Sequence, residues 1–350
     1  MTSKELMLKT FRGEATDQIP VTPHWWGLYK FRLAGIISGY EGEATAWSLS
    51  GQELAKVDEL FYQTFKPDMF HLTTGASHMT RDESYYREYH RLLKEVCKLE
   101  SKAAIDEFVE LAYPSKEEIL ESGVFDHISI LSNKYGEEVF IALNEGNPIC
   151  TIFDSYMGFV EALTALVEKP DMMEYFVFKL YEGLLPRMEA LVEKGAHGYI
   201  GSETYCSCDI ISPQTYRDIV FPAQQFFYKS IERMGLVPIV YFLGDIKPII
   251  KDIRKLGVKG LMIEESKKTF VLDIAEIYRM LEGEIVLFGN LDSVYTLLKG
   301  ATQDVEQETI RQLEVVTNGR FITANGSPIC FDTPAENIHA MVSTVRNYRR

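Results

Sequence analysis

The chain has 350 residues, of which 25% are charged and 46% hydrophobic, and its formal net charge is −15 at pH 7. Such a composition is typical of a globular protein that builds a large core without disulfides or structural metals. Because nucleic-acid binders need a basic face, the negative charge argues against nucleic acid as a partner. The five cysteines lack the spacing of a disulfide framework, and no stretch approaches the roughly 18 apolar residues of a membrane span. We therefore expect a soluble protein of the reducing cytoplasm, without a membrane partner.

The first predicted element is an amphipathic helix near the N-terminus, with Ser3 as its N-cap. Short apolar runs then alternate with helical stretches, which is the pattern of βα units and a parallel sheet. Two later helices have clear starts: Ser212 precedes a proline at the first helical position, and Thr333 begins a stretch with a capping-box glutamate, Glu336. Eight strands are predicted, at Ile19–Pro23, Asp68–Leu72, Val139–Leu143, Gly198–Gly201, Val237–Leu243, Lys259–Ile263, Glu284–Phe288 and Arg320–Thr323.

Eight βα units close a barrel, so the expected fold class is α/β, a (β/α)8 TIM barrel with an N-terminal extension. The whole chain, residues 1–350, is expected to form one domain. The stretch from about residue 74 to residue 134 is too long for a barrel loop and contains a capping box at Ser115 and Glu118. We interpret this stretch as an insertion over the mouth of the barrel, where lids and specificity elements occur.

The residues that follow each strand are the candidates for function, because the active site of such a barrel lies at the carboxyl ends of its strands. Glu264 and Tyr241 are the candidate catalytic residues, since adjacent strands would bring them together and an acid with a raised pKa can protonate a leaving oxygen. Alternation along the strand should direct Glu264 inward and Glu265 outward. The candidates for substrate binding are His24, Trp25, Trp26, Glu145, Glu203, Cys206, Asp245, Asn290, Asn325 and Ser327.

Some of these residues also have a purely structural interpretation. The segment His24-Trp25-Trp26 can be a stacking platform for a flat ligand or ordinary core packing. Cys206 and Cys208, together with Cys150, can supply thiolates to a metal at a new place. However, Cys-x-Cys is not a standard zinc spacing, and free cysteine is among the most buried residue types, so small pocket lining is the simpler interpretation.

Four motifs in register resemble the uroporphyrinogen decarboxylase superfamily. They are Ile210-Ile211-Ser212-Pro213 with Tyr216-Arg217-Asp218, then Val237-Pro238-Ile239-Val240-Tyr241-Phe242-Leu243-Gly244-Asp245, then Gly289-Asn290-Leu291-Asp292, and finally Asp332-Thr333-Pro334-Ala335-Glu336. The superfamily includes porphyrinogen decarboxylases and corrinoid-linked methyltransferases. The resemblance therefore implies a barrel enzyme, and the residues at the motif positions indicate which branch it belongs to.

The methyltransferases that the chain resembles carry His-x-Cys at the end of the fifth strand and another Cys after the eighth, and these three residues hold zinc. At the matching positions this chain has Tyr241, Leu243 and Ser327. Leucine has no ligand atom, and tyrosine with serine is a poor substitute for imidazole and thiolate. The resemblance thus implies an enzyme without the usual zinc site and without a tightly bound cofactor, whose corrinoid is carried by a partner protein.

The decarboxylases carry an Arg-x-x-Gly-Arg stretch after the first strand and an acid after the second. Here Arg32-Leu33-Ala34-Gly35 is followed by Ile36, and no acid follows the second strand at Thr73-Thr74-Gly75. Since a polycarboxylate substrate needs cationic contacts, porphyrinogen decarboxylation is disfavoured. The favoured function is a methyltransferase or demethylase that acts with a corrinoid protein on a small, aromatic or ether-like substrate. The alternatives are a cofactor-independent decarboxylase or lyase of a small acid and a non-catalytic small-molecule binding protein, and a homodimer is left open.

Overall fold

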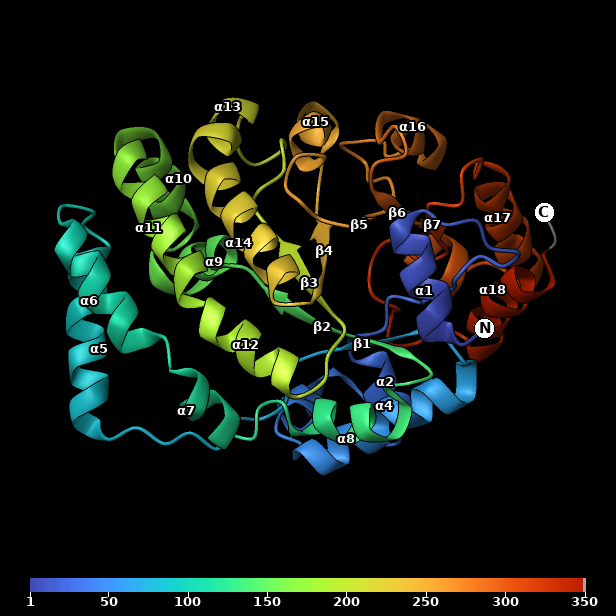
Figure 1. Cartoon of the computed structure of the whole chain (residues 1–350), viewed down its shortest axis with the longest axis horizontal. Helices are drawn as coiled ribbons and strands as arrows, with labels where there is room; N and C mark the ends of the chain where they lie inside the picture. The colour runs from blue at the N-terminus through green and yellow to red at the C-terminus, as the bar shows by residue number, and fades with distance from the viewer. Residues whose placement is uncertain (349–350) are drawn as a thin grey trace.

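The structure is a computed structural model that describes residues 1–348. Seven parallel strands form one curled sheet in which each strand pairs with its successor along the chain. Figure 1 shows these strands at the centre of the molecule, with helices around them. The strands are β1 (Met69–Leu72), β2 (Phe140–Gly146), β3 (Gly198–Glu203), β4 (Val237–Phe242), β5 (Gly260–Ile263), β6 (Val286–Phe288) and β7 (Phe321–Ile322).

Helices precede the first strand, separate the strands and follow the last one. Before β1 lie α1 (Ser3–Arg12), α2 (Tyr29–Leu33), η1 (Tyr40–Gly42), α3 (Glu43–Trp47) and α4 (Gly51–Phe65). Between β1 and β3 lie α5 (Glu83–Val96), α6 (Lys102–Ala112), α7 (Lys116–Glu121), α8 (Asp126–Tyr135), α9 (Pro148–Thr151), η2 (Ile152–Tyr156), α10 (Phe159–Glu168), α11 (Pro170–Gly183) and α12 (Leu185–Glu193). The remaining helices are α13 (Pro213–Thr215), η3 (Tyr216–Val220), α14 (Phe221–Arg233), η4 (Lys247–Ile249), α15 (Ile250–Ile253), α16 (Ile274–Met280), η5 (Ser293–Leu298), α17 (Thr302–Glu314) and α18 (Ala335–Asn347).

The first predicted strand is reduced to a single bridge, whereas the other seven predicted strands correspond to β1–β7. Val21 forms an isolated parallel bridge with Thr323, and its carbonyl oxygen accepts a hydrogen bond of 2.8 Å from the backbone N–H of Asp68. Pro20 and Pro23 flank this bridge and have no N–H to donate, which explains why a regular ladder does not form there. The observed sheet therefore has seven strands, with a bridging segment between β7 and β1.

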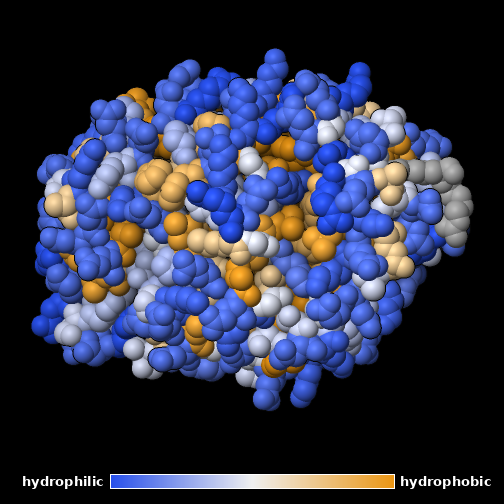
Figure 2. All heavy atoms as spheres, viewed as in Figure 1, coloured by the Kyte–Doolittle hydropathy of each residue, from blue (hydrophilic) through white to orange (hydrophobic). Residues whose placement is uncertain are grey.

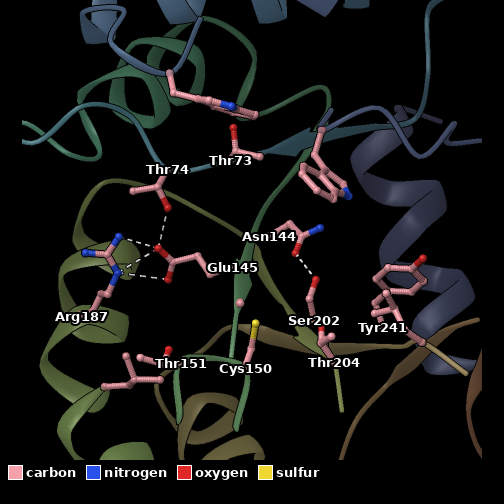
Figure 3. A pocket seen from close by; sticks show the side chains of 15 residues that line it. Thr73, Thr74, Asn144, Glu145, Cys150, Thr151, Arg187, Ser202, Thr204 and Tyr241 are labelled. Carbon is pink, nitrogen blue, oxygen red and sulfur yellow. Dashed lines mark hydrogen bonds and ion pairs between the residues drawn. The ribbon is translucent and has the colours of Figure 1, made fainter. Parts of the chain in front are cut away.

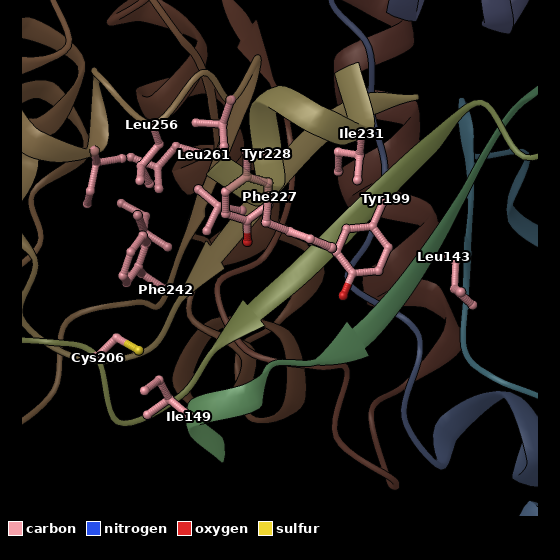
Figure 4. Close-up of a cluster of buried hydrophobic side chains, with 14 of the residues drawn as sticks. Leu143, Ile149, Tyr199, Cys206, Phe227, Tyr228, Ile231, Phe242, Leu256 and Leu261 are labelled. Carbon is pink, nitrogen blue, oxygen red and sulfur yellow. The ribbon is translucent and has the colours of Figure 1, made fainter. Parts of the chain in front are cut away.

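Side chains alternate between two faces of the sheet, as buried parallel strands require. On the inner face, Ile200, Ile239 and Met262 belong to one apolar cluster. Met7 and Phe11 of α1 complete that cluster, because α1 lies across the amino ends of the strands. The outer face packs on the helices; Figure 4 shows part of this layer, including Leu143, Tyr199, Phe227, Tyr228, Phe242 and Leu261.

The predicted insertion forms four helices with different neighbours. α5 packs against α6, and α6 packs against α11, at the left edge of the molecule in Figure 1. α7 packs against α12, and α8 packs against α4. Much of the segment therefore covers the outer helices.

Local sequence signals set several helix starts. The capping box at Ser115 and Glu118 is confirmed, and so is the N-cap at Ser212. The predicted N-cap of α1 is wrong by one residue: Thr2 is the cap, because its hydroxyl accepts from the Glu5 N–H while the Glu5 carboxylate accepts from the Thr2 N–H. The last helix, α18, begins after Pro334 without a side-chain cap, so its predicted capping box is also wrong.

Within residues 1–348, no single helix is long and apolar enough to cross a membrane, although the segments Pro148–Tyr156 and Phe159–Glu168 reach that length and composition as a bent pair. Figure 2 shows hydrophilic side chains over most of the visible face, with hydrophobic ones mainly in the recesses between them.

Candidate functional site

A cavity of about 680 Å³ lies at the carboxyl ends of β1–β4. This size suits a small organic ligand. Figure 3 shows how side chains from several elements converge on it. The lining residues are Trp26, Trp47, Thr73, Thr74, Asn144, Glu145, Gly146, Cys150, Thr151, Leu184, Arg187, Ser202, Thr204, Tyr241 and Leu243.

Uncharged hydrogen-bonding groups form one side of the cavity. Ser202 donates to Asn144 Oδ1 at 2.7 Å, and the Asn144 amide nitrogen is 3.0 Å from His71 Nε2. The His71 ring stacks on His24, with ring centroids 4.7 Å apart, and the Trp26 indole donates to His24 Nε2 at 2.7 Å. Because these contacts occupy the Nε2 lone pair of each imidazole, both rings fit the tautomer that is protonated at Nδ1.

Burial keeps both histidines neutral. It lowers the pKa of His24 to about 3 and lowers the pKa of His71 well below its ordinary value; the nearby His24 and Lys30 add to the second effect. The two imidazoles therefore act as hydrogen-bonding supports for Trp26 and Asn144, which face the cavity, and neither changes charge near neutral pH.

An ion pair forms the opposite side of the cavity. Arg187, in the first turn of α12, donates from Nη2 to Glu145 Oε1 at 2.5 Å and from Nε to both carboxylate oxygens at 2.9 and 3.1 Å. Thr74 donates to the same Glu145 oxygen at 2.7 Å, and the guanidinium lies over the Phe125 ring at 4.6 Å. Figure 3 shows this group away from Tyr241, across the cavity. The cavity thus has an uncharged aromatic side and a charged but neutralised side.

Tyr241 connects the cavity to a cluster of charged residues behind it. Its ring meets His24 edge-on at 4.6 Å, and its hydroxyl lies near Ser327. Burial, with the nearby charges of Glu264 and Glu265, raises the pKa of Tyr241 well above its ordinary value, so the hydroxyl keeps its proton.

Glu264 follows β5 and lies beside the loop after β4. Continuing the strand alternation keeps it on the same face as Met262, the inner one. One of its carboxylate oxygens accepts a hydrogen bond of 2.9 Å from the Gly244 N–H, and its side chain is 15% exposed. Burial raises the pKa of Glu264 above its ordinary value, which favours the protonated form closer to neutral pH.

Three of the predicted site residues line the cavity: Trp26, Glu145 and Tyr241. His24 and Ser327 lie directly behind it, as the contacts above describe. Trp25 lies elsewhere, because it is fully buried and stacks on Phe61 with ring centroids 4.1 Å apart. In this structure the ring of Trp25 is core packing, and only its neighbour Trp26 offers a face to a ligand.

Glu203 points away from the cavity, into the helix layer. It is fully buried and accepts hydrogen bonds from Tyr228 at 2.5 Å, from Tyr181 at 3.1 Å and from Asn147. Burial raises the pKa of Glu203, since no cation accompanies these neutral donors. Cys206 is buried beside it, with its sulfur 3.7 Å from the carboxylate.

Three further predicted residues hold loops in place through hydrogen bonds to backbone groups. Asn290 donates to the carbonyl oxygens of Glu264 and Leu272, at 3.1 and 2.9 Å. Asn325 accepts from the His24 N–H at 2.7 Å, and Asp245 accepts from the N–H two residues later at 3.1 Å. These contacts satisfy backbone groups near the strand ends.

Sequence reasoning missed several lining residues. Asn144 and Ser202 are strand residues on the inner face, so alternation could have indicated them. Arg187 is on a helix and Trp47 ends a short helix far along the chain from any strand end. No local signal could have placed these two at the cavity.

The residues at the expected metal positions do not fit zinc. Tyr241 keeps its proton, Leu243 has no ligand atom, and Ser327 is an uncharged hydroxyl. The alternative thiols hold their protons, which makes them poor ligands, because burial raises the pKa of Cys150 to about 12 and that of Cys208 to about 11. Across residues 1–348, no three His, Cys, Asp or Glu side chains are grouped to hold a metal ion.

Comparisons with known proteins agree with the motifs. The chain is 28% identical over 225 residues to the methylcobamide:CoM methyltransferase MtaA of Methanosarcina barkeri, an alignment that covers 64% of this chain and 63% of MtaA, less than two thirds of that relative. It is 20% identical over 370 residues to the methylcobamide:CoM methyltransferase MtbA of Methanosarcina mazei, covering 99% and 98% of the two chains.

The fold agrees as well. A solved methyltransferase structure from Methanosarcina mazei superimposes with a TM-score of 0.74 at 20% identity, over 99% of this chain and 98% of that one. The family profile described as uroporphyrinogen decarboxylase (URO-D) matches residues 2–348. A match over nearly the whole length, with the same motifs and the same fold, leads to one conclusion: the chain belongs to the uroporphyrinogen decarboxylase family.

Proposed function

We propose that this chain is a methyltransferase or demethylase that works with a corrinoid protein on a small substrate and without a zinc ion. The similarity to methylcobamide:CoM methyltransferases supports the reaction class. The observation that carries the proposal is the position of Tyr241 in the cavity wall, with Glu264 and Ser327 behind it. These groups offer a hydroxyl and a proton where the resembled enzymes hold a metal.

The cavity favours an aromatic or ether-like substrate. It has large apolar surfaces from Trp26, Trp47, Leu184 and Leu243. The polar groups on the side opposite the ion pair are uncharged. Indole rings bind flat ligands by stacking, whereas amide and hydroxyl groups orient a neutral oxygen. A small methoxyaromatic compound has both features.

A corrinoid on the partner protein would supply the cobalt that accepts or donates the methyl group. The residues of this chain bind the substrate, exclude water and handle the proton. When the methyl–oxygen bond breaks, its electron pair stays on the oxygen, which must then gain a proton. We propose that Tyr241 contacts this oxygen and that the protonated carboxyl of Glu264 supplies the proton.

The test is methyl transfer from 3-methoxyphenol to cob(I)alamin, followed by the spectral change to methylcobalamin. We expect transfer that depends on the protein and that falls strongly in Glu264→Gln and in Tyr241→Phe. Glu306→Gln, which changes an exposed acid on α17, is the matched control and should have no effect. The absence of methylcobalamin with a panel of methoxyaromatics and methyl ethers, with free cobalamin and with purified corrinoid proteins alike, would refute the proposal.

Two finer features of the fold belong to the same proposal. We propose that residues 19–23 act as the eighth strand of the barrel; the bridge from Val21 to Thr323 and the hydrogen bond from Asp68 support this. We also propose that the insertion helps to close the mouth, since its residue Phe125 supports the Arg187 guanidinium at the cavity wall. A corrinoid protein would then dock at this mouth.

A further inference from the structure

Behind Tyr241, three side-chain oxygen atoms contact the ammonium group of a lysine whose side chain is 37% exposed. The Lys267 ammonium nitrogen is 2.5 Å from Glu265 Oε1, 3.2 Å from Ser327 Oγ and 3.7 Å from Glu264 Oε1. Ser327 also donates to Glu265 Oε1 at 2.9 Å, so the hydroxyl and the ammonium share one carboxylate oxygen. Two loops of the chain, one after β5 and one around Ser327, thus bring two acids, a hydroxyl and one cation together.

Glu265 needs a cation at this place. Glu265 is 5% exposed, and its second oxygen has no hydrogen-bond partner among the described residues. An ionised carboxylate in such surroundings is strongly unfavourable unless a positive charge neutralises it. Two carboxylates with a hydroxyl are also the ligand types that hard divalent ions prefer. Either an ammonium or a divalent ion can meet this need.

We infer that the Lys267 ammonium takes the place of a divalent metal ion at this wall of the cavity. It holds Glu264, Glu265 and Ser327 together beside the Tyr241 hydroxyl. A metal ion bound to Glu265 Oε1 would lie within a few ångströms of the ammonium, and the two positive charges would repel each other. The lysine therefore also excludes metals from the site. Lys267 is here a positioning residue, since it acts on the cavity through Ser327 and Tyr241.

The test uses the full chain and titration calorimetry with Mn²⁺ or Zn²⁺ alone as the probe. Lys267→Met keeps most of the side-chain length but leaves the Glu265 carboxylate without its cation. We expect this variant to bind one divalent ion per chain at least about a hundredfold more tightly than the wild type, because the repulsion is gone and the negative charge remains. Lys268→Met, a change at the exposed neighbouring lysine, is the matched control and should bind metal as the wild type does.

A second variant separates ligand loss from unfolding. Lys267→Met combined with Glu265→Gln has no unpaired buried acid, so it should fold without metal and lose the acquired affinity. If Lys267→Met is insoluble alone, recovery of folded protein with Mn²⁺ or Zn²⁺ in the buffer supports the inference, and failure to recover with either ion overturns it.

The inference is also overturned if folded Lys267→Met gains no affinity. The same holds if the wild type already binds one ion per chain as tightly as the variant does. The readout is metal binding and not methyl transfer, so its failure would leave the proposed reaction untouched, and failure of that reaction would leave this inference standing.

Discussion

The ion pair between Arg187 and Glu145 in the cavity wall should contribute to the stability of the fold. The partial burial of the two side chains sets the size of this contribution. Arg187→Met removes the only cation among residues 1–348 that contacts Glu145, whose side chain is 11% exposed, while that of Arg187 is 20% exposed. Breaking a fully buried pair costs about 3–5 kcal/mol, and a surface pair contributes about 0–1 kcal/mol. For a pair between these limits we expect a loss of about 2 kcal/mol in the free energy of unfolding. The lost contact with Phe125 adds about 0.5–1 kcal/mol.

Urea denaturation of three variants measures this cost. Arg187→Met should lose about 3 kcal/mol in total, whereas Arg187→Met with Glu145→Gln should lose about 1 kcal/mol, because no unpaired carboxylate remains. Arg254→Met is the matched control; it breaks the contacts of a similarly shielded arginine with Glu282 and Glu284, both well exposed. The reasoning is refuted if the double variant is as unstable as Arg187→Met, or if Arg187→Met loses less than the control.

Three further predictions concern the site and its support. Glu264→Gln should keep the melting temperature but reduce turnover by about a hundredfold, the usual effect of a lost general acid; turnover within a few-fold of wild type would exclude this role. Burial lowers the pKa of His24 in the folded protein to about 3, whereas in the unfolded protein its pKa is the ordinary 6.5. As the pH falls, the unfolded protein therefore binds a proton at this histidine before the folded protein does. The stability that neutral His24 provides is present above pH 6.5 and is lost as the pH falls towards 3. Its share of the loss between pH 7 and pH 5 is about 2 kcal/mol, and urea titrations that show no decline would contradict it. Trp25→Ala should cost about 3–5 kcal/mol of stability, whereas Trp26→Ala should mainly weaken binding of 3-methoxyphenol; equal effects of both on stability would contradict the assignment of Trp25 to the core.

Much of the fold followed from local patterns, because βα alternation repeats regularly along the chain. Seven predicted strands match observed ones. The first predicted strand is only one bridge in the structure, because the prolines around Val21 have no backbone N–H to donate to a neighbouring strand. The strand-end rule also led to Tyr241 and Glu145, which line the cavity. The same rule wrongly assigned Glu203 to the cavity. Alternation from the inner residue Ile200 already places this acid on the outer face.

The rest of the site depends on tertiary packing, which no local pattern encodes. Trp25 and Trp26 are adjacent in a loop, and nothing in their order tells which one enters the core. Arg187 reaches the cavity because α12 lies beside the end of β2. Arg187 is 42 residues from its partner Glu145 along the chain. The neighbourhood of Lys267 and Ser327, 60 residues apart, likewise appears only when the two loops meet.

The helix at the N-terminus covers the amino end of the curled sheet. Met7 and Phe11 complete the apolar cluster on the inner face at this amino end, so packed side chains of the described residues lie beneath the cavity. In the reaction proposed above, substrate, product and a docking carrier protein would share the opening at the carboxyl ends of the strands. Because the opening is shared, a bound carrier protein would keep the substrate or product inside the cavity. The next substrate would enter only after the carrier protein dissociates. Such an enzyme would favour an ordered sequence of arrivals and departures over random association.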